Sequence, residues 1–205
     1  MSPFQSLRPF ARRAQALRPT ESRCELCGAL VAEKHAHVVE LQQHAMRCAC
    51  TACAVLFRDA GAGGGRYRTV PERIVELGPL ALDASDWAQL EIPVQLAFVI
   101  RRDQGFVAMY PSPAGPVEAP LSAAASTALI TRVPRASRLE PEIEALLFHR
   151  PRDGSSVALL VPIDACYELV GLVRQSWRGF DGGDAREQID RFVTRLRSLA
   201  KRDRT

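Results

Sequence analysis

The spacing of apolar and polar residues along the chain predicts a mixed α+β fold. Residues 94–101 and 106–110 combine aromatic and β-branched residues around a short polar turn, which is typical of a β-hairpin. Other short apolar runs, bounded by proline, glycine or charged residues, have the length of strands. Together they indicate a small antiparallel sheet. The predicted strands are 67–70, 73–77, 94–101, 106–110, 143–149 and 157–162.

Helical spacing is clearest at the C-terminal end. Over 185–199 the apolar residues recur every three or four positions, and arginine and lysine fill the other face. Asp184 and Glu187 have the spacing of a capping box at its start. We expect this helix to bury Ile189, Phe192, Val193 and Leu196. Three other helices are expected at 85–90, 122–130 and 166–177.

Two local patterns indicate non-sheet or solvent-facing segments. Three prolines fall within 110–116, and because proline cannot donate a ladder hydrogen bond, this stretch is predicted to be a turn or loop. Glu140, Glu142 and Glu144 alternate with other residues, which predicts a solvated strand face.

Composition supports a globular protein. The chain is 47% hydrophobic and 24% charged, as ordinary folded domains are. No apolar run approaches the roughly 18 residues that suggest a membrane span. The basic N-terminus is not followed by an apolar run of signal-peptide length, so a cytoplasmic location is expected.

Four cysteines form the strongest motif in the sequence. Cys24 and Cys27 are separated by two residues, as are Cys50 and Cys53, and 22 residues separate the pairs. Each pair can turn two thiolates towards one ion, and Gly28 permits the positive φ that closes the first turn. Two such pairs predict a four-sulfur metal site, most simply structural zinc. Rubredoxin-type iron, an iron–sulfur cluster, and unligated or redox-active thiols remain alternatives.

Additional ligand-type residues lie between these pairs. Cys48 is either a small packing residue or an extra ligand that would favour cluster chemistry. His35 and His37 can present both rings on one face of a strand and bind metal. The interpretation favoured by the sequence is an exposed hairpin that carries His35, His37 and His44 between the two cysteine pairs, since four thiolates already complete a zinc shell.

The distribution of charge and glycine suggests three segments. The chain has a net charge of +4, and both of its ends are basic. Most of the cysteines and histidines lie before the glycine-rich stretch 61–65, which is predicted to be a flexible joint. We therefore expect a basic arm at 1–21, a four-cysteine, zinc-ribbon-like module at 22–60, and an α+β domain at 61–205.

Two further groups of residues have chemistry that a site can use. The loop containing Trp177, Arg178 and Phe180 can present a partner-binding surface, or Trp177 can anchor the core. Cys166, His149 and Asp164 supply the residue types of a cysteine hydrolase. Cys166 falls in an apolar element, however, so a buried structural thiol is the favoured interpretation. No nucleophile–base pair stands out, and no enzymatic activity is expected.

Several stretches together resemble an uncharacterised bacterial family, a domain of unknown function whose genes often lie near those of uptake NiFe-hydrogenases. The resemblance spans nearly the whole chain after the basic arm. It implies a hydrogenase-associated accessory or maturation protein and supplies no catalytic residues. The stretches are Cys24–Gly28, Cys48–Cys53 with the following 54–57, 63–68, 110–115, 161–167, 176–179 and 182–183.

Three functions therefore remain open from the sequence. The first is a non-catalytic accessory protein or added subunit that binds a hydrogenase subunit or maturation factor. The second is an iron-binding electron-transfer or cluster-carrying protein that uses the N-terminal thiols. The third, a basic zinc-ribbon protein that binds nucleic acid, is disfavoured because no recognition helix with clustered base-reading residues is evident.

Overall fold

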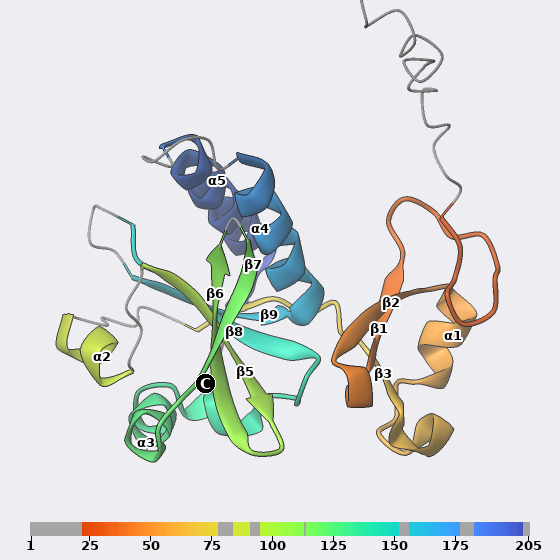
Figure 1. The fold of residues 1–205 in the computed structure, drawn as a ribbon, viewed down its shortest axis with the longest axis horizontal. Coiled ribbons are helices and arrows are strands. Elements are labelled where there is room, and N and C mark those ends of the chain that lie inside the picture. Colours follow the sequence, from red (N-terminus) through yellow and green to blue (C-terminus); the bar gives the residue numbers. More distant parts are fainter. Residues whose placement is uncertain are drawn as a thin grey trace, which may run out of the picture.

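The computed structural model describes residues 22–77, 84–90, 95–112, 114–151, 156–176 and 183–202. These residues form two sheets, a small one near the N-terminus and a large one that contains the other named strands of the described segments. Figure 1 shows the small sheet with its helix at one side of the larger helix-and-sheet body. The fold is mixed α+β, as the sequence predicts. Among the described residues, no helix combines the length and apolar character that a membrane span requires.

The small sheet, here called the module sheet, has the strand order β2-β1-β3 and is antiparallel throughout. A 3-10 turn at Leu41–Gln43 joins β1 to β2, and His44 closes it with φ 49°. The third strand follows the glycine-rich stretch, so this sheet continues beyond the predicted boundary at residue 60. Its elements are β1 (Ala36–Glu40), β2 (Ala45–Ala49), α1 (Thr51–Leu56) and β3 (Tyr67–Thr69).

The large sheet has the order β10-β4-β9-β8-β5-β6-β7, and only its β10–β4 pair is parallel among the described strands. The predicted hairpin is confirmed, with Ile100 opposite Val107. The strand predicted at 157–162 is present with those bounds, and those predicted at 73–77 and 143–149 are present but shorter. The strands are β4 (Val75–Glu76), β5 (Leu96–Arg102), β6 (Gly105–Ser112), β7 (Gly115–Pro120), β8 (Glu144–His149), β9 (Val157–Pro162) and β10 (Lys201–Arg202).

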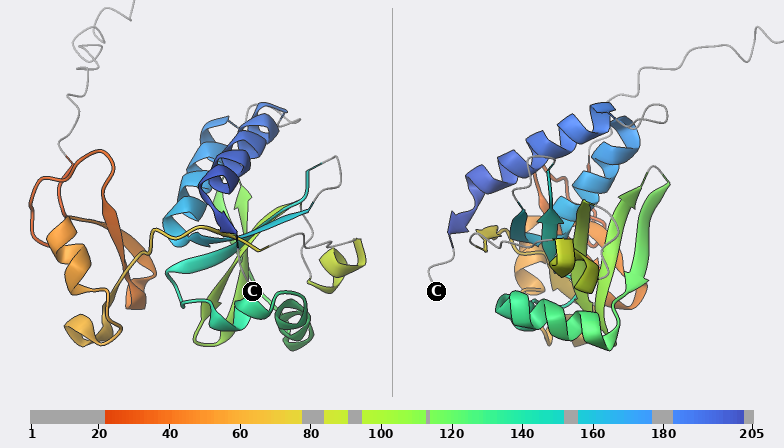
Figure 2. Two further views of the ribbon diagram at one scale, coloured as in Figure 1. Left: turned by 180° about the vertical axis from the view of Figure 1, so that it is seen from behind. Right: turned by 90° about the vertical axis from the view of Figure 1, so that its left-hand side faces the viewer.

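Helices cover both faces of the large sheet, because its central strands are apolar on both sides. In β5, Phe98 and Ile100 point to one face while Ala97 and Val99 point to the other. Figure 2 shows α4 and α5 against the first face and α3 on the opposite side. Burying each large aliphatic or aromatic side chain contributes about 1.5–3 kcal/mol. The helices are α2 (Ala84–Gln89), α3 (Ala123–Arg132), α4 (Ile163–Ser176) and α5 (Gly183–Leu199).

The four predicted helices are confirmed. Ser122 caps α3 by accepting a hydrogen bond from the amide of Ala125 at 3.1 Å. In α5, Phe192, Val193 and Leu196 are buried as expected, while Ile189 is only partly covered. The side chain of Asp184 lies outside the described residues, so the capping box stays a prediction.

The prediction of a loop across the proline-rich stretch 110–116 is wrong. Pro111 lies in β6 opposite Pro116 of β7. Pairing of β6 with β5 ends at Met109, so the missing amide of Pro111 interrupts no bond to β5. Pro116 lies in β7, the edge strand of the sheet. Both prolines therefore occupy strand positions where the ladder requires no donor from them.

The prediction of a solvated glutamate face is also wrong. Glu144 is fully buried in β8 and receives hydrogen bonds from Arg73 at 2.5 and 2.9 Å. The backbone amide of Glu140 also donates to the Glu144 carboxylate, at 3.1 Å. Burial of a carboxylate is tolerated here because a guanidinium and an amide replace its water.

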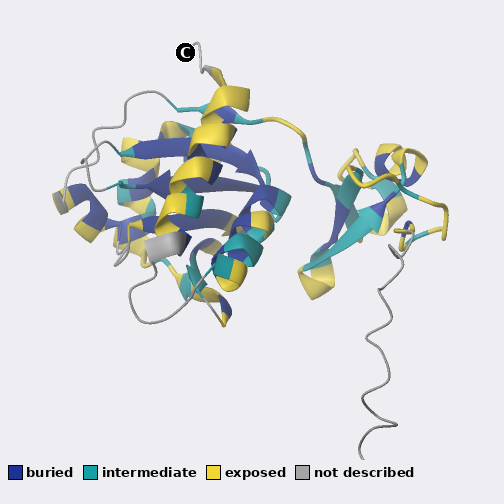
Figure 3. Ribbon diagram, turned by 90° about the horizontal axis from the view of Figure 1, so that it is seen from above, coloured by how far each residue is buried: buried dark blue, intermediate teal, exposed yellow. Residues whose placement is uncertain are grey.

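The module sheet packs against the body through β1 and the chain that follows β3. Val39 and Val70 belong to the same apolar cluster as the sheet face beneath α4. Arg68 forms an ion pair with Glu140 at 3.0 Å across this junction. Figure 3 shows the body strands largely buried, with exposed residues on the outer sides of the helices and module.

Candidate metal centre

The four motif cysteines come together at one end of the module. Their sulfurs all lie within 4.8 Å of one another. Cys24 and Cys53 are buried, Cys50 is half-buried and Cys27 is exposed. A small apolar cluster that includes Val38 and Ala54 packs beside them. The sequence pattern therefore does correspond to one spatial group of thiols.

The first cysteine pair lies on a tight turn closed by backbone hydrogen bonds. The amide of Gly28 donates to the carbonyl of Cys24 at 2.8 Å, and the amide of Cys24 donates to the carbonyl of Ala29 at 2.7 Å. Gly28 has φ 77°, a left-handed conformation that a residue with Cβ rarely adopts. The predicted role of this glycine is confirmed.

The second pair lies at the start of α1. Cys50 is the N-cap residue, and its sulfur accepts a hydrogen bond from the amide of Cys53 at 3.5 Å. Glu25 joins the two turns, because its amide donates to the carbonyl of Cys48 at 2.9 Å. The Glu25 carboxylate in turn accepts a bond from the amide of Cys48 at 2.6 Å. These hydrogen bonds connect the two cysteine turns and help to position their sulfurs.

The sulfur spacing fits a tetrahedral thiolate site. With metal–sulfur bonds of about 2.3 Å, ligand sulfurs in a tetrahedron are about 3.8 Å apart. The sulfurs of Cys27 and Cys50 are 3.7 Å apart. The donor set and spacing suit zinc, and they suit iron equally well.

Electrostatics within the cluster favour a bound cation. Burial by itself raises the pKa of Cys24, but hydrogen bonds from backbone amides outweigh it and lower that pKa to about 6. For Cys53, burial and then the adjacent sulfurs raise the pKa to about 12. The Cys24 thiolate thus forms readily while the Cys53 thiol resists ionisation. A divalent ion would remove this conflict, since it holds coordinating thiols deprotonated.

Cys48 lies apart from the four-cysteine group. It forms a second cluster with His35 and His37, whose ligand atoms are again within 4.8 Å of one another. Burial, followed by the carboxylate of Glu25, raises the pKa of the Cys48 thiol. The two histidines are half-buried rather than exposed, so the interpretation of a freely exposed histidine hairpin applies only to His44.

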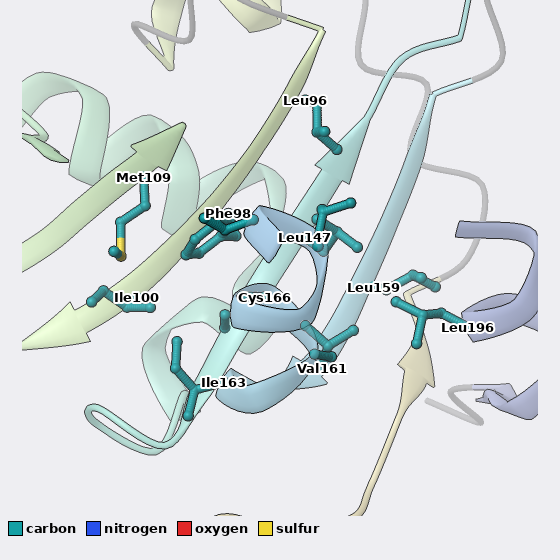
Figure 4. Packing of buried hydrophobic residues seen from close by; sticks show 14 of the residues in the cluster. Leu96, Phe98, Ile100, Met109, Leu147, Leu159, Val161, Ile163, Cys166 and Leu196 are labelled. Atoms are coloured by element: carbon teal, nitrogen blue, oxygen red, sulfur yellow. The ribbon is translucent and has the colours of Figure 1, made fainter. Parts of the chain in front are cut away.

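The other sequence candidates divide into two groups. Cys166 lies fully buried in α4 among the residues of the main core, as Figure 4 shows. Burial raises its pKa well above the ordinary value, which fits a structural thiol. Trp177, Arg178 and Phe180 lie outside the described residues, as does the basic arm at 1–21.

Sequence reasoning missed the roles of two residues that support these clusters, although it named Asp164 as a candidate for a different site. Glu25 connects the cysteine turns, and Asp164 accepts a hydrogen bond from His37 at 3.2 Å. No local pattern indicates Asp164, because it joins the site from a helix of the body. The β1–β2 register places His37 opposite Cys48. Aligning the two strands of this hairpin correctly from the sequence would have indicated that these two residues lie together.

Comparison with known proteins gives a family but no activity. No curated protein and no solved structure matches the chain. Residues 23–200 match a family described as "Family of unknown function (DUF5947)". Because this match covers most of the sequence, including both cysteine pairs, the chain belongs to that family of unknown function.

Proposed function

We propose that this protein is a metal-binding accessory protein that works by binding a protein partner, with structural zinc in a zinc-ribbon-like module. The observation that carries the proposal is the group of four cysteine sulfurs within 4.8 Å of one another. Four thiolates fill a tetrahedral shell and leave no position for water or substrate. The centre then stabilises a surface and performs no chemistry of its own.

The local structure supports a binding role for the module. Cys27 is exposed, and Leu30, Val55 and Leu56 are large apolar residues with 50% or more of their surface exposed. They lie on the turn and helix that carry the two cysteine pairs. Exposed apolar side chains held by a metal-stabilised turn are suited to contact another protein.

The proposed partner is a subunit or maturation factor of a NiFe-hydrogenase. This part of the proposal rests on the resemblance drawn from the sequence, including the Cys24–Gly28 and Cys48–Cys53 motifs. The partner-binding loop with Trp177, Arg178 and Phe180 belongs to the same proposal. The proposal includes a cytoplasmic location, for which the support is the sequence pattern of the N-terminus.

The test is recovery of the tagged protein from bacteria that express an uptake hydrogenase. We expect wild type to recover a hydrogenase component, and Cys27→Ser to recover much less because the turn loses its metal. Cys166→Ala, which removes a thiol remote from the centre, should behave as wild type. The proposal is wrong if wild type recovers no hydrogenase component and deletion of the gene leaves hydrogen uptake unchanged.

A further inference from the structure

A second set of metal-ligand side chains lies on the face of the β1–β2 hairpin that points to the body. His37 in β1 is directly opposite Cys48 in β2. His35 precedes His37 by two positions, so it shares the same face of the extended chain. Val39 also shares this face and packs in the main core, whereas Val38 packs beside the four cysteines. The two clusters therefore occupy opposite faces of the hairpin.

Hydrogen bonds orient both imidazole rings in the manner of metal ligands. His35 Nδ1 lies 2.8 Å from the carbonyl oxygen of Ala32 and 3.2 Å from that of Glu33. Carbonyl oxygens only accept, so this nitrogen carries the proton and Nε2 holds the lone pair. His37 Nδ1 lies 3.2 Å from the Asp164 carboxylate. A carboxylate or carbonyl on one ring nitrogen is the usual arrangement when the other binds a metal.

His35 provides an independent indication of a missing ligand. Its Nε2 is buried and has no hydrogen-bond partner among the described residues. A buried acceptor without a donor costs about 1–3 kcal/mol. The ring of His35 lies 4.9 Å from that of His37, centroid to centroid, and one ligand atom from each ring lies within 4.8 Å of the other and of the Cys48 sulfur.

From this geometry we propose that His35, His37 and Cys48 bind a second divalent transition-metal ion, such as zinc. Two imidazoles and a thiolate are ligands that zinc accepts, and a spread within 4.8 Å needs little closure to reach bonds of about 2.0–2.3 Å. Three protein ligands leave a fourth position for water or for a donor from a partner. This site differs from the closed four-cysteine centre, and its existence does not depend on the proposed function.

The site also joins the module to the body. Asp164 lies in the first turn of α4 and contacts Nδ1 of His37. The metal would bind the same imidazole ring through its other nitrogen. Metal binding at this point would fix the orientation of β1 relative to α4. The second ion is therefore a clamp between the two parts, whereas the first stabilises the module internally.

The experiment is a titration of the full-length, zinc-containing protein with Co²⁺, followed by thiolate-to-cobalt charge-transfer absorption and by metal analysis after gel filtration. Wild type is expected to bind one equivalent more than either His35→Ala or Cys48→Ser. Asp164→Asn should keep the additional equivalent but weaken its affinity about 10–100-fold. Because the readout is a difference between variants, it does not depend on which metal occupies the four cysteines.

His44→Ala is the matched control. His44 also pairs with a body carboxylate, at 3.1 Å from Glu142, but lies outside the cluster. This variant should bind as much Co²⁺ as wild type. Retention of the four-cysteine metal and an unchanged circular dichroism spectrum identify variants that are folded. The proposal is overturned if folded His35→Ala and Cys48→Ser bind the same number of equivalents as wild type.

Discussion

His37 in the module sheet and Asp164 at the start of α4 are 127 positions apart in the chain, yet His37 Nδ1 lies 3.2 Å from Asp164 Oδ2. This contact places the hairpin that follows the first cysteine pair directly on the body. It also explains why His37 is only half-exposed. The two faces of β1 therefore pack against different parts of the protein, one against the four cysteines and the other against the main core.

Two adjacent valines test this division. Val38 is buried beside the four cysteines, and Val39 is buried in the main core. Each Val→Ala change should cost about 1–3 kcal/mol through lost burial and a residual cavity. Val38→Ala should release the metal of the four-cysteine centre to a chromogenic chelator faster than wild type does. Val39→Ala should release that metal at the wild-type rate but unfold at a lower temperature. Equal release rates for the two variants would contradict the assignment of the faces.

The buried ion pair between Arg73 and Glu144 gives a second prediction. Arg73→Ala leaves a fully buried carboxylate without its guanidinium, which should destabilise the protein by about 3 kcal/mol, since Arg73 is itself half-exposed. Arg191→Ala removes an exposed pair with Glu187 within α5 and should cost about 0.5 kcal/mol or less. Urea denaturation of both variants measures the difference. A loss for Arg73→Ala as small as that for Arg191→Ala would show that Glu144 is not buried as described.

Glu40 should make stability depend on pH. A hydrogen bond from Arg66, reinforced by Arg47, holds the pKa of the Glu40 carboxyl below its ordinary value. Its folded-state pKa is therefore lower than its unfolded-state pKa, so the stabilisation is fully present above about pH 4.3 and is lost as the pH falls through the folded-state value.

Thermal unfolding of wild type and Glu40→Gln checks this. The two share the metal centre, so acid-induced metal loss affects both alike. The melting temperature of wild type should exceed that of the variant by a constant amount between pH 7 and about 5.5 and by less near about pH 4. A gap that widens on acidification would contradict the sign of the shift.

Local rules predicted much of the fold and of the four-cysteine group. The strands and helices follow from periodicity, and Cys24 with Gly28 has the spacing that its turn requires. Prediction failed where tertiary contacts decide the outcome. Pro111 occupies a strand because the pairing of β6 with β5 stops at Met109. Glu144 is buried because Arg73, 71 positions away, reaches it.

The same limit applies to the second cluster. Cys48 lies two positions before Cys50 in the sequence, and the sequence left it as either a small packing residue or an extra ligand of the four-cysteine centre. The antiparallel register instead places it opposite His37. Asp164, the body's contribution, is separated from His37 by most of the chain. No spacing rule relates residues so far apart, so only the docking of the module on α4 brings them together.

Metal analysis of the purified protein, combined with its visible spectrum, tests the central claim most directly. We predict zinc that survives dialysis against a moderate chelator, because four thiolates form a closed shell, and a colourless protein, because zinc has a filled d shell. Cys27→Ser should lose this metal and Cys166→Ala should keep it. Iron with a visible thiolate-to-metal absorption, or a wild-type protein that holds no metal at all, would contradict the account.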